Sequence, residues 1–301
     1  MSNSGFVLLD KIAGETSFKA LFPLKRVFST KRVGHAGTLD LRASGLIIAA
    51  TGRCTRLLPF IEAKDKCYSF RLHLGYETDT LEWDGEVVEQ GEALAITREQ
   101  LEVVLPQFTD DIEQVPPKYC AVKINGVRAS DLMERGRNIE LKPRKIHIGE
   151  LKVIGEGEVT EGCSGKEFAT FDLICECSKG IYIRALGRDI GRALGTYACV
   201  SQIRRHRIGN VTLDKAVRGE NLTRENLLPV DAVLDFPVVR LTDERVAVIR
   251  QGNWLPWKEK VEGVGPEGHV FAANMQGEVL SLCFYEPGRI KPKFYLGEDE
   301  K

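Results

Sequence analysis

Three runs of alternating apolar and polar residues do most to constrain the fold of this 301-residue chain. They span residues 68–74, 145–154 and 168–177. A period of two places one face of a β-strand in the core and turns the other face toward solvent. Glycine- and glutamate-rich residues join the second and third runs, which predicts a hairpin. We therefore expect a largely antiparallel mixed sheet in an α+β fold.

Helices are predicted around these strands. The clearest is IYIRALGRDIGRAL (181–194), which ends at Gly195. A second is expected over 97–105. A third is expected over 18–28, where Pro23 should kink or shorten it.

Two segments without a regular apolar period are predicted to be loops. VGHAGTLDLRASG (33–45) carries three glycines and leads into the apolar run LIIAA (46–50), which has the character of a buried strand. A long basic loop is expected from Val115 to about Arg144. Near Pro229–Pro237 the pattern changes to short strands punctuated by glycine and proline. The sequence thus predicts two domains, residues 1–235 and a small β domain over 236–301.

Charge is unevenly distributed although the net charge is only −1. Residues 16–39 hold five basic side chains and no acidic ones, and residues 179–218 hold nine basic against two acidic, a net of +7. Residues 76–114 hold one basic against twelve acidic, a net of −11. This polarity suggests one face for a polyanion and another facing water, but ordinary solvated surfaces explain it equally well.

Several protein classes are disfavoured by what the sequence lacks. The N-terminus has no basic region followed by the apolar core of a secretory signal, and the longest apolar run, 45–51, is too short to cross a bilayer. None of the eight cysteines has the two-residue spacing of a zinc knuckle. We expect a cytoplasmic protein with reduced, mostly buried thiols, no metal and no membrane contact.

Asp40 lies within the glycine-containing loop, where a lone aspartate is usually a turn or cap residue. Arg184, Arg188 and Arg192 recur every four residues and form one basic stripe along the predicted helix. The start of that helix, just after Gly180, suits a phosphate or a carboxylate. From these residues alone, a turn aspartate and a solvated helix face remain open alternatives.

Five motifs in order carry a resemblance to a known family. They are GHAGTLD (34–40), KCY (66–68), GYETDT (75–80), QVPPKYCAVK (114–123) and CSKGIYIRALGRDIG (177–191). Together they resemble the motifs of TruB-type pseudouridine synthases, which modify uridine 55 in the T-arm of tRNA. The resemblance runs from about Gly5 to Arg207 and continues more weakly through the tail.

The resemblance implies catalytic roles for three residues. Asp40 falls on the catalytic aspartate that acts on the flipped uridine, and Arg184 falls on the arginine paired with it. A neighbouring guanidinium favours the ionised carboxylate and orients it. Tyr68 falls on the aromatic residue stacked on the target base, although its strand position also suits core packing.

Further residues are implied to contact the substrate. His35 falls on the histidine that helps to displace the target nucleotide. Lys11 and Gly14 resemble an N-terminal Lys-Pro-x-Gly motif, and Lys179 and Tyr182 fall beside the reactive pocket. From the basic segments we expect further RNA contacts at Arg188, Arg192, Arg204 and Arg205. The sequence departs from the family pattern at three positions, namely Ile12 and Leu41 in place of prolines and Ser130 in place of a tyrosine.

The resemblance implies an isomerase that breaks the N1–C1′ bond of uridine, turns the base and joins C5 to C1′. Such a reaction needs no cofactor, and we expect none. Residues 1–235 would be the catalytic domain, with an RNA-gripping loop over about 116–144. Residues 236–301 would be a PUA-like RNA-binding domain. The expected partner is the T-arm of tRNA, and the expected state is a monomer.

Three alternatives remain at the level of sequence. A nucleoside or glycoside hydrolase would pair Asp40 with a second carboxylate such as Asp79. A tRNA-folding chaperone would hold the T-arm without chemistry. An RNA-guided relative would modify ribosomal RNA within a protein complex, although the long loop resembles the stand-alone bacterial type better.

Overall fold

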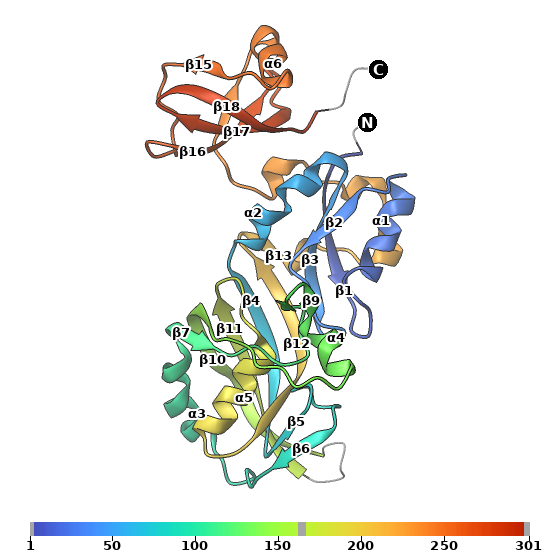
Figure 1. Cartoon of the computed structure of the whole chain (residues 1–301), viewed down its shortest axis with the longest axis vertical. Helices are drawn as coiled ribbons and strands as arrows, with labels where there is room; N and C mark the ends of the chain where they lie inside the picture. Colours follow the sequence, from blue (N-terminus) through green and yellow to red (C-terminus); the bar gives the residue numbers. More distant parts are fainter. Residues whose placement is uncertain (1–2, 162–166, 298–301) are drawn as a thin grey trace.

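A computed structural model describes residues 3–161 and 167–297. These residues form a nine-stranded sheet through the body of the molecule (Figure 1). Its order is β1-β3-β12-β4-β11-β10-β7, with β2 paired to β3 and β13 paired to β12. The strands are β1 (Gly5–Lys11), β2 (Val33–Ala36), β3 (Ser44–Thr51), β4 (Lys66–Leu74), β7 (Asp110–Gln114), β10 (Arg144–Glu161), β11 (Glu167–Cys177), β12 (Ala198–Ile208) and β13 (Val211–Thr212).

This sheet confirms the predicted mixed, largely antiparallel architecture. The alternating runs of the sequence are β4, β10 and β11, and β4 lies between β12 and β11. Within the described residues, the one parallel pair of this sheet joins β3 to β12. Phe70, Leu72 and Leu173 project from β4 and β11 into the main apolar core.

The helices are short. They are α1 (Phe22–Val27), α2 (Leu58–Glu62), α3 (Arg98–Val104), α4 (Ala129–Glu134), α5 (Ile183–Ala193) and α6 (Asp243–Arg250). Of these, α2, α3 and α5 contact strands of this sheet. α5 is the predicted helix after Gly180, and it packs closely on β12 because Gly187 lacks a side chain. A Cβ at Gly187 would lie 2.3 Å from Cγ1 of Val200. No helix in the part of the chain that the structure describes combines the length and apolar character needed to span a bilayer.

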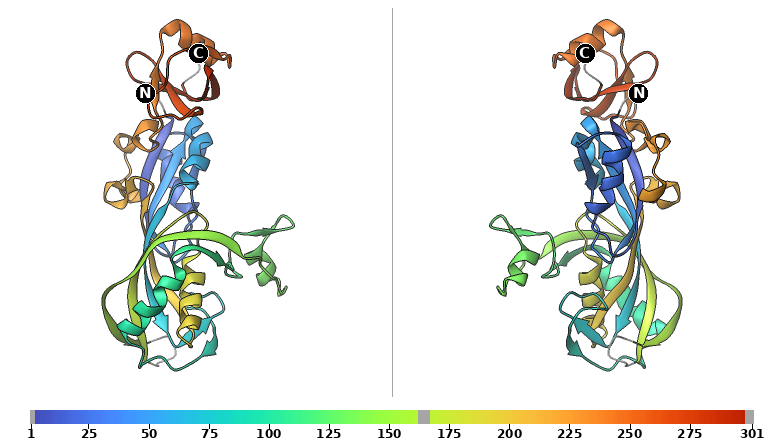
Figure 2. Two further views of the ribbon diagram at one scale, coloured as in Figure 1. Left: turned by 90° about the vertical axis from the view of Figure 1, so that its left-hand side faces the viewer. Right: turned by 90° about the vertical axis from the view of Figure 1, so that its right-hand side faces the viewer.

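Two loop predictions are partly wrong. The segment 33–45 begins with β2, whose pairing to β3 makes it a strand, so the loop itself covers only 37–43. The segment 115–143 contains β8 (Lys123–Ile124), β9 (Val127–Arg128) and α4. Figure 2 shows this segment projecting to one side of the body. We call residues 115–143 the thumb.

Other predicted elements also shift. The helix expected over 18–28 is a 3₁₀ turn, Lys19–Leu21, followed by α1 with Pro23 in its first turn. β10 continues through most of the expected hairpin, whose tip at 162–166, with Cys163, lies outside the described residues. The seven other cysteines are buried thiols, as predicted. β5 (Tyr76–Thr78) and β6 (Val87–Gln90) form a separate hairpin in the acidic segment.

The C-terminal residues form a second sheet at the top of Figure 1. Its strands are β14 (Val238–Arg240), β15 (Leu255–Trp257), β16 (Gly268–Ala273), β17 (Val279–Glu286) and β18 (Gly288–Tyr295). One face of this sheet is not independent of the body, because Phe271 and Leu282 share an apolar cluster with Ile61, Ile208 and Leu234. The predicted β-rich tail is therefore present and is docked on the body through a common core.

Candidate active site

Asp40 lies in the loop 37–43, which is held on its N-terminal side by Ser17. The Ser17 hydroxyl donates to the Leu39 carbonyl at 3.0 Å and accepts from the Leu39 N–H at 2.9 Å. Ser17 and Leu39 are both buried. This two-way contact sets the backbone just before Asp40, whose carboxylate remains partly exposed.

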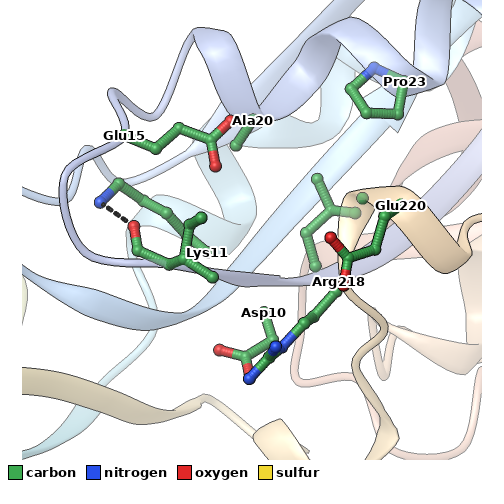
Figure 3. A pocket seen from close by; sticks show the side chains of 10 residues that line it. Asp10, Lys11, Glu15, Ala20, Pro23, Arg218 and Glu220 are labelled. Carbon is green, nitrogen blue, oxygen red and sulfur yellow. Dashed lines mark hydrogen bonds between the residues drawn. The ribbon is translucent and has the colours of Figure 1, made fainter.

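Lys11 holds the other side of the same loop. Its buried Nζ donates to the carbonyls of Ile12, Leu41 and Ala43 at 3.0, 3.3 and 2.5 Å. Burial lowers the pKa of Lys11 to about 8, an effect opposed by the nearby carboxylates of Glu15 and Asp40. The dashed line in Figure 3 marks the Ile12 bond, beside a cavity of about 170 Å³. Lys11 thus acts on the backbone that follows Asp40.

Gly14 supports the same turn from outside. Its N–H donates to the Leu41 carbonyl at 2.8 Å, and its φ of +84° is a conformation that favours glycine. Lys11 and Gly14 do not line the cavity in front of Asp40. The structure therefore brings both predicted residues to the loop and gives them backbone contacts.

Arg184 comes from the first turn of α5 and pairs with Asp40. Its Nε lies 2.8 Å from Oδ2 of Asp40, and its two terminal nitrogens donate to the carbonyls of Thr80 and Tyr119 at 2.9 Å each. The Arg184 side chain is only 5% exposed. The three guanidinium nitrogens thus bond to Asp40 and to two backbone carbonyls, which fixes the orientation of the side chain.

The Asp40 carboxylate faces a cavity of about 530 Å³. Its lining includes Tyr68 of β4, Lys179 and Tyr182, all three of which the sequence predicted. Burial raises the pKa of Tyr68, while the nearby Arg205 guanidinium opposes that shift. The Tyr68 hydroxyl is therefore a neutral donor at ordinary pH, set in the wall of the cavity.

Arg205 is the buried support of this wall. Its side chain donates to the carbonyls of Leu46 and Gly37 at 2.8 and 2.9 Å, and its third nitrogen lies 3.5 Å from the Tyr68 hydroxyl. Gly45 is required beside it, because a Cβ there would lie 2.3 Å from the Arg205 carbonyl oxygen. The predicted RNA contact at Arg205 is thus placed inside the protein, with 1% of the residue exposed.

The start of α5 is positioned by Gln114, the last residue of β7. The Gln114 side chain accepts from the Tyr182 N–H at 2.8 Å and donates to the Tyr182 carbonyl at 3.2 Å. Burial raises the pKa of the Tyr182 phenol, and Cys120 contributes in the same direction. A carboxylate held by an arginine, two phenols and a lysine therefore converge on one cavity.

Comparison with known proteins identifies the family. Residues 25–183 match the model of the TruB family pseudouridylate synthase N-terminal domain. The tRNA pseudouridine synthase B of Caulobacter sp. (strain K31) is 36% identical over 96% of this chain and 94% of its own length. The chain belongs to the TruB family. The protein of the same name from Bradyrhizobium diazoefficiens is 37% identical over 96% of this chain and 84% of its own.

Solved structures support the same fold. A chain in an H/ACA RNP bound to a substrate RNA containing 2′-deoxyuridine superposes with a TM-score of 0.72 at 18% identity, covering 98% of this chain and 86% of its own. A chain of a Cbf5-Nop10-Gar1 complex gives 0.68 at 22% identity, covering 98% and 84%. As a member of the TruB family, the chain is an isomerase of the pseudouridylate synthase class.

The predicted TruB histidine, His35, lies in β2 and is not part of the cavity lining. Its Nδ1 is buried and lacks a hydrogen-bond partner among the described residues. Burial lowers the pKa of His35, and the Arg205 guanidinium lowers it further. The imidazole is therefore neutral at ordinary pH, and its role in displacing a nucleotide stays a prediction.

Three predicted RNA-binding arginines are paired within the protein. Arg188 is buried and bonds to Asp189 and to the Val115 carbonyl. Arg192 bonds to Glu77 at 3.1 Å. Arg204 pairs with Asp10 at 2.9 Å. None of these three arginines lines the cavity in front of Asp40.

The sequence analysis did not identify four charged residues of this TruB site. Glu62, Lys66 and Arg144 line the cavity, and burial lowers the pKa of Lys66 to about 8. Oε1 of Glu82 lies 4.0 Å from Nε of Arg184 and has no hydrogen-bond partner in the described ranges. Burial raises the pKa of Glu82, against the effect of Arg184. Lys66 stood within a quoted motif and could have been found there, whereas Glu82 carried no separate signal.

In 3–161 and 167–297, no three His, Cys, Asp or Glu side chains gather in a way that could hold a metal ion. The expectation that no metal or cofactor is needed stays a prediction.

Proposed function

We propose that this chain converts uridine 55 in the T-loop of tRNA to pseudouridine, with Asp40 as the catalytic carboxylate. The observation that carries the proposal is the Asp40–Arg184 ion pair, 2.8 Å long, at a cavity that also contains Tyr68. The tRNA substrate is supported by the names of relatives that align with 96% of this chain. The T-loop position is supported by the motifs around Asp40 and Tyr68.

The geometry suits the chemistry of a flipped base. The reacting bonds of a uridine are hidden while it is stacked, so the enzyme must extrude the nucleotide into a pocket. Tyr68 offers a ring for the base and a protonated hydroxyl, and Arg184 orients the Asp40 carboxylate through a 2.8 Å bond. Asp40 then acts while the N1–C1′ bond breaks and the C5–C1′ bond forms, with no net gain or loss of water or electrons.

A hydrolase is less well supported. Glycoside hydrolysis uses two carboxylates that flank the scissile bond. Asp79, the predicted partner, accepts N–H bonds from Thr80 and Glu86 at 2.8 and 3.0 Å and does not line the cavity. Asp79 therefore serves as a turn residue in this geometry. Glu62 is the other carboxylate of the described lining, and it accepts from the Gly37 N–H at 3.3 Å.

The division of labour along the chain is also part of the proposal. Residues 1–235 carry the chemistry, the thumb grips RNA, and residues 236–301 add RNA affinity as a PUA-like domain. The thumb contains exposed cations including Lys118, Lys123 and Arg128, which supports a phosphate contact. The proposal also takes the chain to act as a monomer.

The test is to incubate the protein with an unmodified tRNA transcript and to map pseudouridine by carbodiimide treatment and primer extension. A stop at uridine 55 with the wild type, and none with Asp40→Asn, is expected. The Asn side chain keeps the shape but removes the anion, so tRNA affinity should stay within several-fold.

Other outcomes separate the rivals. An abasic site instead of pseudouridine would indicate a hydrolase. Tight binding with no product would indicate a chaperone, and product formed only when a guide RNA is added would indicate the RNA-guided type. Wild-type turnover by Asp40→Asn, after deamidation is excluded, would contradict the role of Asp40.

A further inference from the structure

Two phenylalanine rings lie exposed at the first helical segment of the chain. Phe18 is 58% exposed and Phe22 is 51% exposed. The segment has a separate buried face that packs on the sheet, made of Ala20, Leu21, Leu24 and Phe28. Core packing therefore does not explain the two rings. They contact each other edge to face, with ring centroids 5.7 Å apart and an interplanar angle of 83°.

A cation accompanies both rings. Nζ of Lys25 lies 4.9 Å from the Phe18 centroid and 5.1 Å from the Phe22 centroid. Lys19 and Arg26 are exposed nearby in the chain, and residues 16–39 contain no acidic side chain. Within the described ranges, no carboxylate pairs with Lys19, Lys25 or Arg26. The surface thus combines π-faces with positive charge that the protein itself does not neutralise.

This surface is tied to the catalytic loop. Phe18 follows Ser17, whose hydroxyl is bonded in both directions to Leu39, and Asp40 follows Leu39. Leu41, on the other side of Asp40, is also exposed. Phe18 and Asp40 therefore each directly follow a residue of the buried Ser17–Leu39 contact, and both side chains are at least partly exposed to solvent.

We propose that Phe18, Phe22 and Lys25 form a stacking platform for an unpaired base of the RNA substrate. The base would be next to the nucleotide that enters the cavity, and Lys25 would contact its phosphate. The proposal rests on the proposed function only in taking RNA as the substrate. Proteins bind single-stranded RNA by stacking bases on aromatic side chains beside basic residues, largely without regard to sequence.

A protein partner suits the surface less well. The cores of protein interfaces are depleted of lysine, whereas here a lysine ammonium lies against both rings. Charge complementarity therefore favours a polyanion over a second copy of a chain whose net charge is −1.

The experiment compares two double variants of the full chain. Phe18→Leu with Phe22→Leu keeps the apolar surface but removes the rings, and Phe18→Tyr with Phe22→Tyr keeps the rings. Val103→Ala removes another exposed apolar side chain, from α3, and is the matched control. Filter binding gives the Kd for an unmodified tRNA transcript, and single-turnover assays at saturating enzyme give the rate of pseudouridine formation.

We expect the leucine pair to raise Kd about 5- to 150-fold, which is the range for losing one stacked base. The tyrosine pair and Val103→Ala should stay within about twofold of the wild type. The single-turnover rate should change less than Kd, because the catalytic groups are untouched.

Three results would overturn the platform. They are an unchanged Kd for the leucine pair, a loss of rate without a loss of affinity, and a wild-type dimer that the leucine pair converts to monomer. The failure of the proposed function is separate, since it would appear as no pseudouridine from the wild type. In that case, the platform would still be supported if the leucine pair raised the Kd for tRNA and the tyrosine pair did not.

Discussion

The two basic stretches of the chain use their charges in different ways. In residues 179–218, five of the nine basic side chains form ion pairs with acidic side chains of the same chain: Arg184–Asp40, Arg188–Asp189, Arg192–Glu77, Arg204–Asp10 and Arg207–Glu176. A sixth, Arg205, is buried on carbonyl oxygens. In residues 16–39, none of the five basic side chains pairs with a carboxylate of the described chain.

The difference shows why net charge along a sequence is a poor guide to a binding surface. The +7 stretch looked like the stronger RNA contact, but part of the acidic segment folds against it. Glu77 reaches Arg192, and Glu82 lies 4.0 Å from Arg184. For these residues the acidic and basic segments therefore meet and do not form separate faces. The weaker basic stretch is the one with charge left for a polyanion.

The largest expected effect tests whether Arg184 serves the catalytic group. Arg184→Ala removes the guanidinium that bonds to Asp40, so the single-turnover rate should fall by about a hundredfold or more. Kd for tRNA should change only a few-fold. Lysine at this position should restore little, because it lacks the planar fork. Single-turnover mapping of pseudouridine and filter binding measure both quantities.

Arg188→Ala is the matched control for that variant. Arg188 lies one turn later on α5, is also buried, and also holds a thumb carbonyl, that of Val115, but it does not touch Asp40. Its replacement should reduce the rate far less than the replacement of Arg184. If both variants lower the single-turnover rate equally, Arg184 acts by holding the thumb through Tyr119. If Arg184→Ala changes only the Kd for tRNA, Arg184 is a phosphate contact.

A smaller effect is expected on stability at β12. Arg205→Met leaves the carbonyls of Leu46 and Gly37 without a buried donor, which should lower the free energy of unfolding by about 2–4 kcal/mol. Arg207→Met, two residues on, removes a partly exposed pair with Glu176 and should cost about 1 kcal/mol or less. Urea denaturation measures both. Similar values for the two variants would mean that the burial of Arg205 has no energetic consequence.

Much of the fold could be predicted from the sequence because its signals are local. The alternation in β4, β10 and β11 and the capping residue Thr97 of α3 lie within single elements. β2 could not be predicted, because its four residues have no alternation and become a strand only by pairing with β3. The thumb elements were missed for the same reason, since β8 and β9 are two residues each and depend on each other.

The residues of the site also differ in whether a local sequence signal or a contact between distant segments defines them. Nothing in spacing joins Asp40 to Arg184, which is 144 positions away, so their pairing came from the family resemblance alone. The contacts that hold the loop, Ser17 with Leu39 and Lys11 with Ala43, span 22 and 32 positions. No local pattern encodes such contacts. The sequence therefore identified reactive groups, and the structure identified what positions them.

The next effect concerns the unpaired cations of residues 16–39. Lys19, Arg26 and Lys31 are exposed, and replacing all three by Gln should raise Kd for tRNA about tenfold at moderate salt. The slope of log Kd against log salt should also become shallower, by about 0.7–0.9 for each phosphate that the variant no longer neutralises. Filter binding over a salt series measures both. The single-turnover rate at saturating enzyme should be unchanged.

The control for that series is Lys152→Gln. Lys152 is exposed on β10 but is paired with Glu150 at 2.8 Å, so its replacement should leave Kd and the salt slope almost unchanged. If the triple variant behaves like this control, the unpaired stretch does not face RNA and the comparison of the two stretches fails.

The smallest effect is the most direct test of that comparison. The sequence assigned Arg192 to RNA binding, yet its guanidinium is paired with Glu77, whose side chain is 11% exposed. Because that pair already satisfies the charge, Arg192→Gln should change Kd for tRNA by less than about twofold and stability by less than about 1 kcal/mol. Arg26→Gln should weaken binding more. Glu77→Gln releases Arg192 and should therefore tighten binding slightly, and in that background Arg192→Gln should reverse the gain. A double-mutant cycle of Kd values at low salt measures this coupling. If Arg192→Gln alone weakens binding as much as Arg26→Gln, the pair with Glu77 does not prevent Arg192 from binding RNA. Ion pairing in the free protein would then not predict which cations contact RNA.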